Sequence, residues 1–188
     1  SYIVVIASLL RMEIVPRAGG AVKKHVLHEL KEGVIYTFGF APIKYVILLL
    51  SLVSIMGVSF VVLMPVFARE VLRGGSHTFG FLMGAIGLGS LIAALYLASK
   101  RTVLGLVRLI PLAAGVFGAG LIAFSFSRIF LLSSALLVIA GLGMMLQMAA
   151  SNTILQTIVD DDKRGRVMSF YAMAFMGTAP FGSLLAGL

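Results

Sequence analysis

Long uninterrupted runs of apolar residues constrain this chain more than any other feature of its sequence. A helix needs about 20 consecutive apolar residues to cross the hydrocarbon core of a bilayer. Five successive runs reach that length, and only Arg108, near the end of one run, is charged. The runs cover residues 45–67, 79–99, 104–126, 129–150 and 167–188. One such run could be a buried helix of a soluble protein, but five in a row predict an all-α, polytopic transmembrane helix bundle.

The composition excludes most other classes of protein. Only 12% of the residues are charged, about half of the 25% that is typical of soluble domains, and the mean hydropathy is +1.10. Cys is absent, which excludes a disulfide framework and a zinc–thiolate site. A net charge of +8 could indicate nucleic acid, but the basic residues lie in short gaps between the apolar runs. We therefore expect no nucleic-acid partner.

The ends of the sequence and its basic residues predict a topology. Residues 2–10 make about half a span, and no polar residue follows the last run, so we expect a fragment whose residues 1–10 end a truncated transmembrane helix. Alternate gaps hold twelve of the fifteen Lys and Arg residues, and basic-rich loops face the cytoplasm. This places residues 11–44, 100–108 and 153–166 in the cytoplasm, and residues 45–188 hold the remaining spans.

The first loop contains an amphipathic segment, KKHVLHELKEGVIYTF, in residues 23–38. Its apolar residues recur at helical spacing and its charged residues occupy the other faces, which is typical of a short helix lying on the cytoplasmic surface of a bilayer. A structural linker is the simpler interpretation, and a regulatory or partner-binding role is the alternative. His25 and His28 have no third ligand nearby, so we expect no metal site here.

Small residues and prolines indicate how the spans pack. Helices in lipid approach closely through small side chains, and Gly80, Gly84, Gly87 and Ser90 form such a stripe in the second complete run. Near the end of the chain, Pro180 lies between Gly177 and Gly182 in the segment GTAPFG. Proline removes a backbone donor and can bend its helix. These three residues are therefore candidate hinge residues of a transporter, with a simple packing kink as the alternative.

The polar and flexible side chains within the spans are candidates for a binding site. Gln147 lies well inside the fourth run, and Asn152 follows near the same face, which is the geometry for lining a polar cavity. Hydrogen bonding between helices is the alternative for both residues. Met144 and Met148 lie on the same helix turn, and thioethers adapt to varied apolar shapes. We expect these residues to contact a small molecule or to fill gaps between helices.

Other chemistry has no support in the sequence. No catalytic motif or phosphate-binding loop is present, so we predict neither an enzyme nor a cofactor. The three aspartates at 160–162 adjoin Lys163, Arg164 and Arg166, and this predicts a solvated loop of mixed charge instead of a metal site. No Asp or Glu lies at mid-membrane depth in any run. If transport is driven by protons, we expect the exchanging carboxylate in another part of the protein.

Two segments carry a resemblance to a known family. They are HELKEGVIYTF in the first loop and NTILQTIVDDDKRGRVMSFYAMAFMGTAPFGSLLAG at the end of the chain. The chain resembles helices six to eleven of the major facilitator superfamily, and it is similar to the bacterial enterobactin-exporter and macrolide-efflux branch. The resemblance covers essentially the whole chain. Its most specific part consists of Asn152, Gln156 and the start of the last helix, residues 164–167, with Arg164 and Arg166.

The resemblance implies more than the residues alone do. It implies about twelve helices in two bundles around a central cavity, so that the amino-terminal half is a partner missing from this chain. It makes Tyr171 and Phe175 cavity residues, and it places Lys100 and Arg101 in a cytoplasmic loop motif that gates the transporter. That motif is incomplete here, because ALYLASKRTVLG lacks its acidic residue.

We therefore expect part of a secondary transporter in a bacterial inner membrane. The predicted activity is export of an amphipathic small molecule, siderophore-like or drug-like, by alternating access and driven by protons. The alternatives are a nutrient or lipid transporter of the same fold, and a membrane scaffold or sensor that transports nothing.

Overall fold

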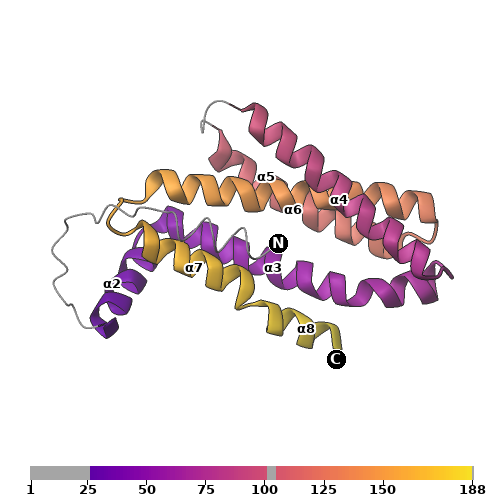
Figure 1. Cartoon of the computed structure of the whole chain (residues 1–188), viewed down its shortest axis with the longest axis horizontal. Coiled ribbons are helices and arrows are strands. Elements are labelled where there is room, and N and C mark those ends of the chain that lie inside the picture. Colours follow the sequence, from indigo (N-terminus) through magenta and orange to yellow (C-terminus); the bar gives the residue numbers. More distant parts are fainter. Residues whose placement is uncertain (1–25, 101–104, 188) are drawn as a thin grey trace, which may run out of the picture.

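The computed structural model describes residues 26–100 and 105–187, and every regular element in these residues is a helix. Figure 1 shows them as a bundle of long helices that run roughly side by side. The elements, in chain order, are α2 (Val26–Gly39), α3 (Ala41–Val66), the π-helix η1 (Phe67–Val71), α4 (Ser76–Ser99), α5 (Leu106–Phe126), α6 (Phe130–Ile158), α7 (Arg164–Met176) and α8 (Ala179–Gly187). The predicted half-span at residues 1–10 lies outside the described residues.

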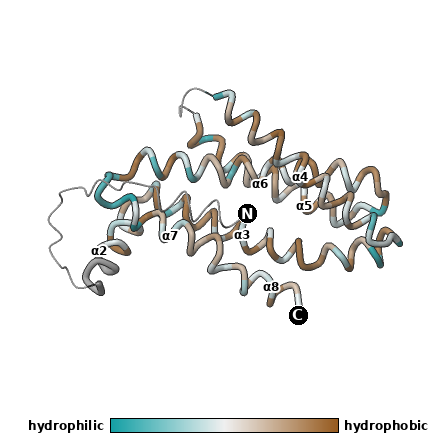
Figure 2. The backbone as a smooth tube through the Cα atoms, viewed as in Figure 1, coloured by the Kyte–Doolittle hydropathy of each residue, from teal (hydrophilic) through white to brown (hydrophobic). Residues whose placement is uncertain are grey.

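Four of the described helices are long and apolar enough to cross a bilayer: Ala41–Val71, Ser76–Ser99, Leu106–Phe126 and Phe130–Ile158. Their most apolar stretches have mean hydropathies of 2.0 to 2.8. Figure 2 shows the polar residues gathered at the two ends of the bundle, where the loops lie. The transmembrane helix bundle predicted from the apolar runs is therefore confirmed.

The boundary predicted at residue 44 is wrong by a few residues. α3 begins at Ala41 with Pro42 in its first turn, so Lys44 belongs to the helix and not to the preceding loop. Proline favours the start of a helix because the first N–H groups have no acceptor within the helix. A long Lys side chain near a helix end can also reach the interface. Taking the first residue after a charged one as the start of the helix therefore places this start a few residues too late.

The last apolar run, residues 167–188, forms two helices instead of one, and they are separated at the glycine–proline segment where the sequence predicts a bend. α7 ends at Met176 and α8 begins at Ala179. Pro180 explains the break, because it has no N–H for the carbonyl of Met176 and its ring would collide with that carbonyl in a regular helix. Figure 1 shows the resulting change of direction between α7 and α8.

α6 lies between α4 and α5 in close backbone contact with both. A Cβ atom added to Gly89 of α4 would collide with the Val138 carbonyl of α6, and one added to Gly141 would collide with the Ile86 carbonyl of α4. On the other side, a Cβ atom at Gly143 would lie 2.7 Å from the Ala113 carbonyl oxygen of α5. These contacts require glycine, because no side chain fits between the backbones.

The predicted packing stripe of α4 does not make these contacts. A Cβ atom at Gly80, Gly84 or Gly87 would meet no heavy atom of another described residue within 4 Å. Ser90 is the exception, because its hydroxyl donates to the Gly141 carbonyl at 3.3 Å. Gly89 and the buried Ala93 lie on the face of α4 that packs against the described bundle.

α3 forms the other side of the bundle together with α7 and α8 (Figure 1). A cluster of buried side chains joins α3, the end of α6 and α7, with Leu50, Leu155 and Val167 almost inaccessible to solvent. The predicted amphipathic segment forms α2, which precedes α3 and packs against the start of α7. The fold therefore places α2 and the loop between α6 and α7 at one end of the bundle.

Candidate functional site

A cavity of about 290 Å³ opens between α6 and α7. On α6, residues three or four apart lie on one face, and the cavity-lining residues of this helix follow that spacing. The lining residues are Met145, Met148, Ala149, Asn152, Thr153 and Tyr171. The cavity therefore combines thioether, methyl and aromatic surface with an amide and two hydroxyl groups.

Hydrogen bonds fix the polar side chains of this cavity. The Tyr171 hydroxyl donates to the Met148 carbonyl of α6 at 3.1 Å, and Asn152 is also a hydrogen-bonding neighbour of Tyr171. The Gln156 amide donates to the Asn152 side-chain oxygen one turn further along α6. Tyr171 is the one lining residue that α7 contributes, so the position of α7 determines the shape of the cavity.

The structure brings together three of the six predicted cavity residues, namely Met148, Asn152 and Tyr171. Phe175 instead packs against the apolar cluster between α3 and α7. Met144 packs near Gly57 and Phe117, on the side of α6 that faces α3 and α5. Binding of a substrate by these residues stays a prediction.

Gln147 is completely buried by residues of this chain alone. Its amide donates to the Ser151 hydroxyl at 3.2 Å, and its side-chain oxygen has no hydrogen-bond partner. This placement favours the alternative interpretation, in which Gln147 takes part in packing between helices. An added partner can only bury more surface, so Gln147 faces no open cavity in this conformation.

Sequence reasoning missed Ala149 and Thr153 as lining residues and did not single out Met145 among the methionines. The signal was present, because Met145, Met148, Ala149 and Asn152 follow the spacing of one helical face. Ala and Thr are, however, common on every face of a transmembrane helix. Only the position of α7 shows which face of α6 lines the cavity.

The three candidate hinge residues lie at or beside the break between α7 and α8. Gly177 is the first residue after α7, and its N–H donates to the Met173 carbonyl at 2.8 Å. Pro180 lies in the first turn of α8, and Gly182 is buried against α3. A Cβ atom at Gly182 would lie 2.7 Å from the Ile55 carbonyl oxygen. Motion at this break remains a prediction.

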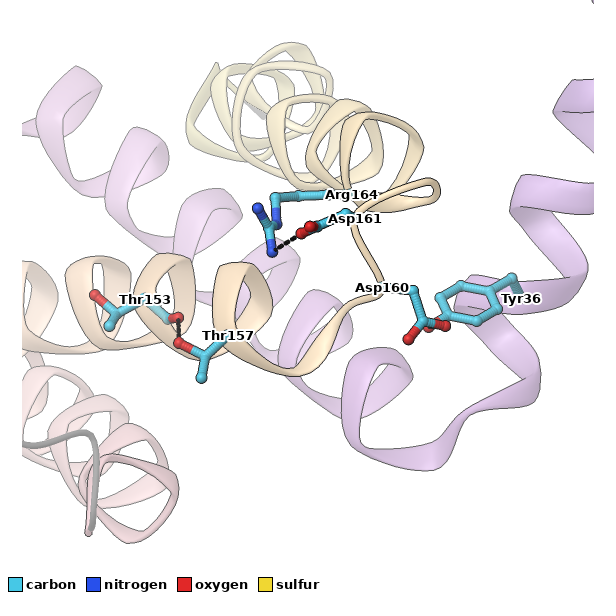
Figure 3. A network of polar contacts seen from close by, with 6 residues as sticks. All are labelled: Tyr36, Thr153, Thr157, Asp160, Asp161 and Arg164. Atoms are coloured by element: carbon cyan, nitrogen blue, oxygen red, sulfur yellow. Dashed lines mark hydrogen bonds and ion pairs between the residues drawn. The ribbon is translucent and has the colours of Figure 1, made fainter. Parts of the chain in front are cut away.

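The candidate gating residues lie at helix ends. Lys100 follows the last residue of α4, and its ammonium group lies 4.9 Å from the centre of the Tyr96 ring. Arg101 lies outside the described residues. Arg164 begins α7 and forms an ion pair of 2.5 Å with Asp161, which Figure 3 shows. Arg166, in the first turn of α7, lies beside Gly33 of α2.

α2 is attached to the loop between α6 and α7 by its aromatic residues. The Tyr36 hydroxyl donates to the Asp160 carboxylate at 3.3 Å (Figure 3). The Lys163 ammonium group lies 4.5 Å from the centre of the Tyr36 ring, and Phe38 makes an edge-to-face contact with Phe170 of α7. These contacts lie at the surface, so each contributes only a small stabilising free energy to the docking of α2.

Among the described residues, no group of three His, Asp or Glu side chains could hold a metal ion.

The fold and the cavity are those of a multi-pass membrane protein, and comparison with known proteins gives its family. The whole chain, residues 1–188, matches the family of the major facilitator superfamily described as transmembrane secretion effector. The protein belongs to this family of membrane transporters. The resemblance to the superfamily is thereby confirmed, whereas the enterobactin-exporter branch stays a prediction.

A particular relative is the staphyloferrin A transporter of Staphylococcus aureus (strain NCTC 8325 / PS 47). It is 31% identical to this chain over 137 residues, which cover 73% of the chain and 34% of the relative. The chain thus spans about a third of the length of this relative. No solved structure matches the chain.

Proposed function

We propose that the complete protein is a secondary active exporter of amphipathic small molecules, siderophore-like or drug-like, which works by alternating access. The observation that carries this proposal is the cavity between α6 and α7, where Met145 and Met148 adjoin Asn152 and Tyr171. Flexible thioethers accept varied apolar shapes, and the amide and phenol can orient a polar group. A sugar would require more hydrogen-bonding groups than this lining offers.

The relative supports a siderophore-like substrate, because its name states that it transports staphyloferrin A. We further propose that the substrate enters a cavity shared with an amino-terminal half of about six helices, in a bacterial inner membrane. In this arrangement α2 and the loop between α6 and α7 face the cytoplasm, as the basic residues predict.

We propose a proton gradient as the driving force. Within the spans of the described residues, the one acidic side chain is Glu70 of η1, at the end of its span and exposed. A carboxylate that exchanges protons at mid-membrane depth therefore belongs to the amino-terminal half in this proposal. In this proposal, the present chain supplies the binding surface and the helix that moves, which is α7.

Inside-out vesicles that contain the full-length protein would test this proposal. With an imposed pH gradient, we expect uptake of staphyloferrin A or of a fluorescent amphipathic dye, and no uptake after the gradient is dissipated. Asn152→Leu removes the amide from the cavity and should lower uptake about tenfold, through loss of one or two hydrogen bonds to the substrate. Ser134→Ala is the matched control, because the Ser134 hydroxyl only bonds to its own helix, far from the cavity.

The alternatives predict different results. Accumulation of either compound in right-side-out vesicles would indicate uptake instead of export. Absence of gradient-dependent flux for both compounds, with the protein correctly inserted, would contradict the transport proposal and favour a scaffold or sensor. Equal uptake by the Asn152→Leu and Ser134→Ala variants would show that the protein transports the compound but does not bind it in this cavity.

A further inference from the structure

Three of the last four carbonyl groups of α7 accept a hydrogen bond, each from a different kind of donor. In a continuous helix each carbonyl accepts a hydrogen bond from the N–H four residues later, and a helix end leaves these carbonyls without partners. The Met173 carbonyl still receives the Gly177 N–H at 2.8 Å. The Ala174 carbonyl receives the Thr178 hydroxyl at 2.8 Å. The Phe175 carbonyl receives a hydroxyl from another helix.

That donor is Ser54 of α3, whose hydroxyl lies 2.6 Å from the Phe175 carbonyl oxygen. Ser54 is buried, with 3% of its surface exposed, and no backbone N–H of the described residues donates to this carbonyl. The neighbouring Ser51 behaves differently, because its hydroxyl bonds only to the Ile47 carbonyl of its own helix at 3.0 Å. Ser54 thus provides α7 with a hydrogen bond that the break has removed.

A different conformation of the segment would give the Phe175 carbonyl another donor. In a continuous helix it would accept the N–H of Ala179, which is four residues later and is not a proline. Ser54 is then not required. A continuous and a broken conformation of this segment would therefore each satisfy the Phe175 carbonyl, with the Ala179 N–H in the first and the Ser54 hydroxyl in the second.

We propose that the α7–α8 segment is a two-state element and that Ser54 is the positioning residue that favours the broken state. The continuous state is disfavoured by Pro180, which leaves the Met176 carbonyl without a donor in either conformation and collides with it in a regular helix. A ligand or a partner half can shift such an equilibrium only by interacting differently with the two states. The hydroxyl of Ser54 provides one such difference.

In this proposal, the state of the α7–α8 segment affects the cavity through the position of α7. Tyr171 lies one turn before Phe175 on the same helix, and it contributes the α7 side of the cavity lining. If α7 loses its bond to Ser54, the Tyr171 ring shifts relative to Met148, whose carbonyl it contacts at 3.1 Å. This consequence for binding rests on the proposed function, whereas the two states of the segment do not.

Distance measurements between two spin labels would test the proposal in the full-length protein. Ser169 on α7 and Leu184 on α8 are exposed, so cysteines for labelling can replace them, and this chain contains no other Cys. In a continuous helix their Cα atoms would be about 22 Å apart, and the bend changes that distance. Ser54→Ala should raise the ratio of continuous to broken segments about tenfold, the effect expected from removing the partner of one buried carbonyl.

Two further variants make the result decisive. Pro180→Ala supplies an N–H to the Met176 carbonyl and removes the ring, so it should shift the distances in the same direction without altering α3. Ser51→Ala, three residues before Ser54 on α3, should leave the distances unchanged. If Ser54→Ala and Pro180→Ala both keep the wild-type distances in folded protein, the two-state proposal is wrong. Because the distances are measured without substrate, that result would not depend on whether the protein is an exporter.

Discussion

The two sides of this bundle differ in the contacts that dominate between their helices. α4, α5 and α6 meet through glycines such as Gly89, Gly141 and Gly143, where backbone lies against backbone and no side chain intervenes. α3 meets α7 and α8 through an apolar cluster and one close glycine, Gly182, and it adds serine hydroxyls to these contacts. Ser54 bonds to the Phe175 carbonyl, and Ser59 bonds to the Gly182 carbonyl at 2.7 Å. The first side joins continuous helices. The second joins α3 to a helix that is broken in its middle.

The difference shows where movement costs least. A glycine contact between backbones has no side chain that can rotate, so sliding one helix past the other loses the whole contact at once. A hydroxyl can exchange one carbonyl for another by rotation about a single bond. We therefore expect α4, α5 and α6 to move as a unit, and α7 and α8 to move relative to it. The following substitutions test this comparison.

The largest effect is expected from Gly89→Ala in α4. The new Cβ atom would collide with the Val138 carbonyl of α6, and overpacking of this kind costs about 1–3 kcal/mol. Gly87→Ala is the control, because a Cβ atom there meets nothing within 4 Å, and Ala favours a helix by about 1 kcal/mol over Gly. Thermal unfolding in detergent should show a lower Tm for Gly89→Ala and an unchanged or higher Tm for Gly87→Ala. Equal Tm values would contradict the rigid contact.

A smaller effect is expected from Gly182→Ala in α8. Its Cβ atom would lie 2.7 Å from the Ile55 carbonyl oxygen and 3.1 Å from the Val58 Cβ atom. Because α8 follows a break, it can tilt away at a cost of about 1 kcal/mol, at the low end of the range for overpacking. We expect faster labelling of a cysteine placed at Val58, whereas Gly187→Ala, in open space, should not change the labelling rate. If Gly182→Ala lowers the Tm more than Gly89→Ala does, the contact between α3 and α8 is the more rigid of the two, contrary to our expectation.

The smallest effect is expected at the surface, where α2 meets the loop between α6 and α7. Tyr36→Phe removes the hydrogen bond to Asp160 but retains the ring under Lys163. Exposed polar contacts contribute about 0–1 kcal/mol, so the Tm should change by no more than about 4 °C. Tyr36→Leu, which also removes the ring, provides the comparison. A large change for Tyr36→Phe would show that α2 is an essential part of the bundle.

The sequence predicted the spans well because the bilayer imposes a simple rule on them. Four apolar runs correspond to single helices, and each end differs by only a few residues except at the carboxyl end of α6, which continues to Ile158. The fifth run met the same rule, yet it is broken at Gly177. Apolar length cannot detect a break that depends on the missing N–H of Pro180 and on a donor from α3.

The contacts between helices were less predictable. Gly87 and Gly89 are chemically identical and two residues apart, but only Gly89 touches α6. Which glycine is used depends on the rotation of α4 about its axis, and the sequence of α4 alone does not determine it. The same holds for α6, where Gln147 points into the packing and Asn152 into the cavity. Half of the predicted cavity residues were therefore placed on a different face.

The break between α7 and α8 also has a consequence for the order in which the protein is assembled. α7 has thirteen residues and would span about 20 Å as a regular helix, so it does not cross the hydrocarbon core alone. In lipid, a carbonyl without a donor is costly, and the donor for the Phe175 carbonyl lies on α3. Until α3 is packed beside it, the segment can satisfy that carbonyl only with its own Ala179. If the two-state proposal holds, we expect this segment to enter the bilayer in the continuous conformation and the break to form as the bundle closes around it.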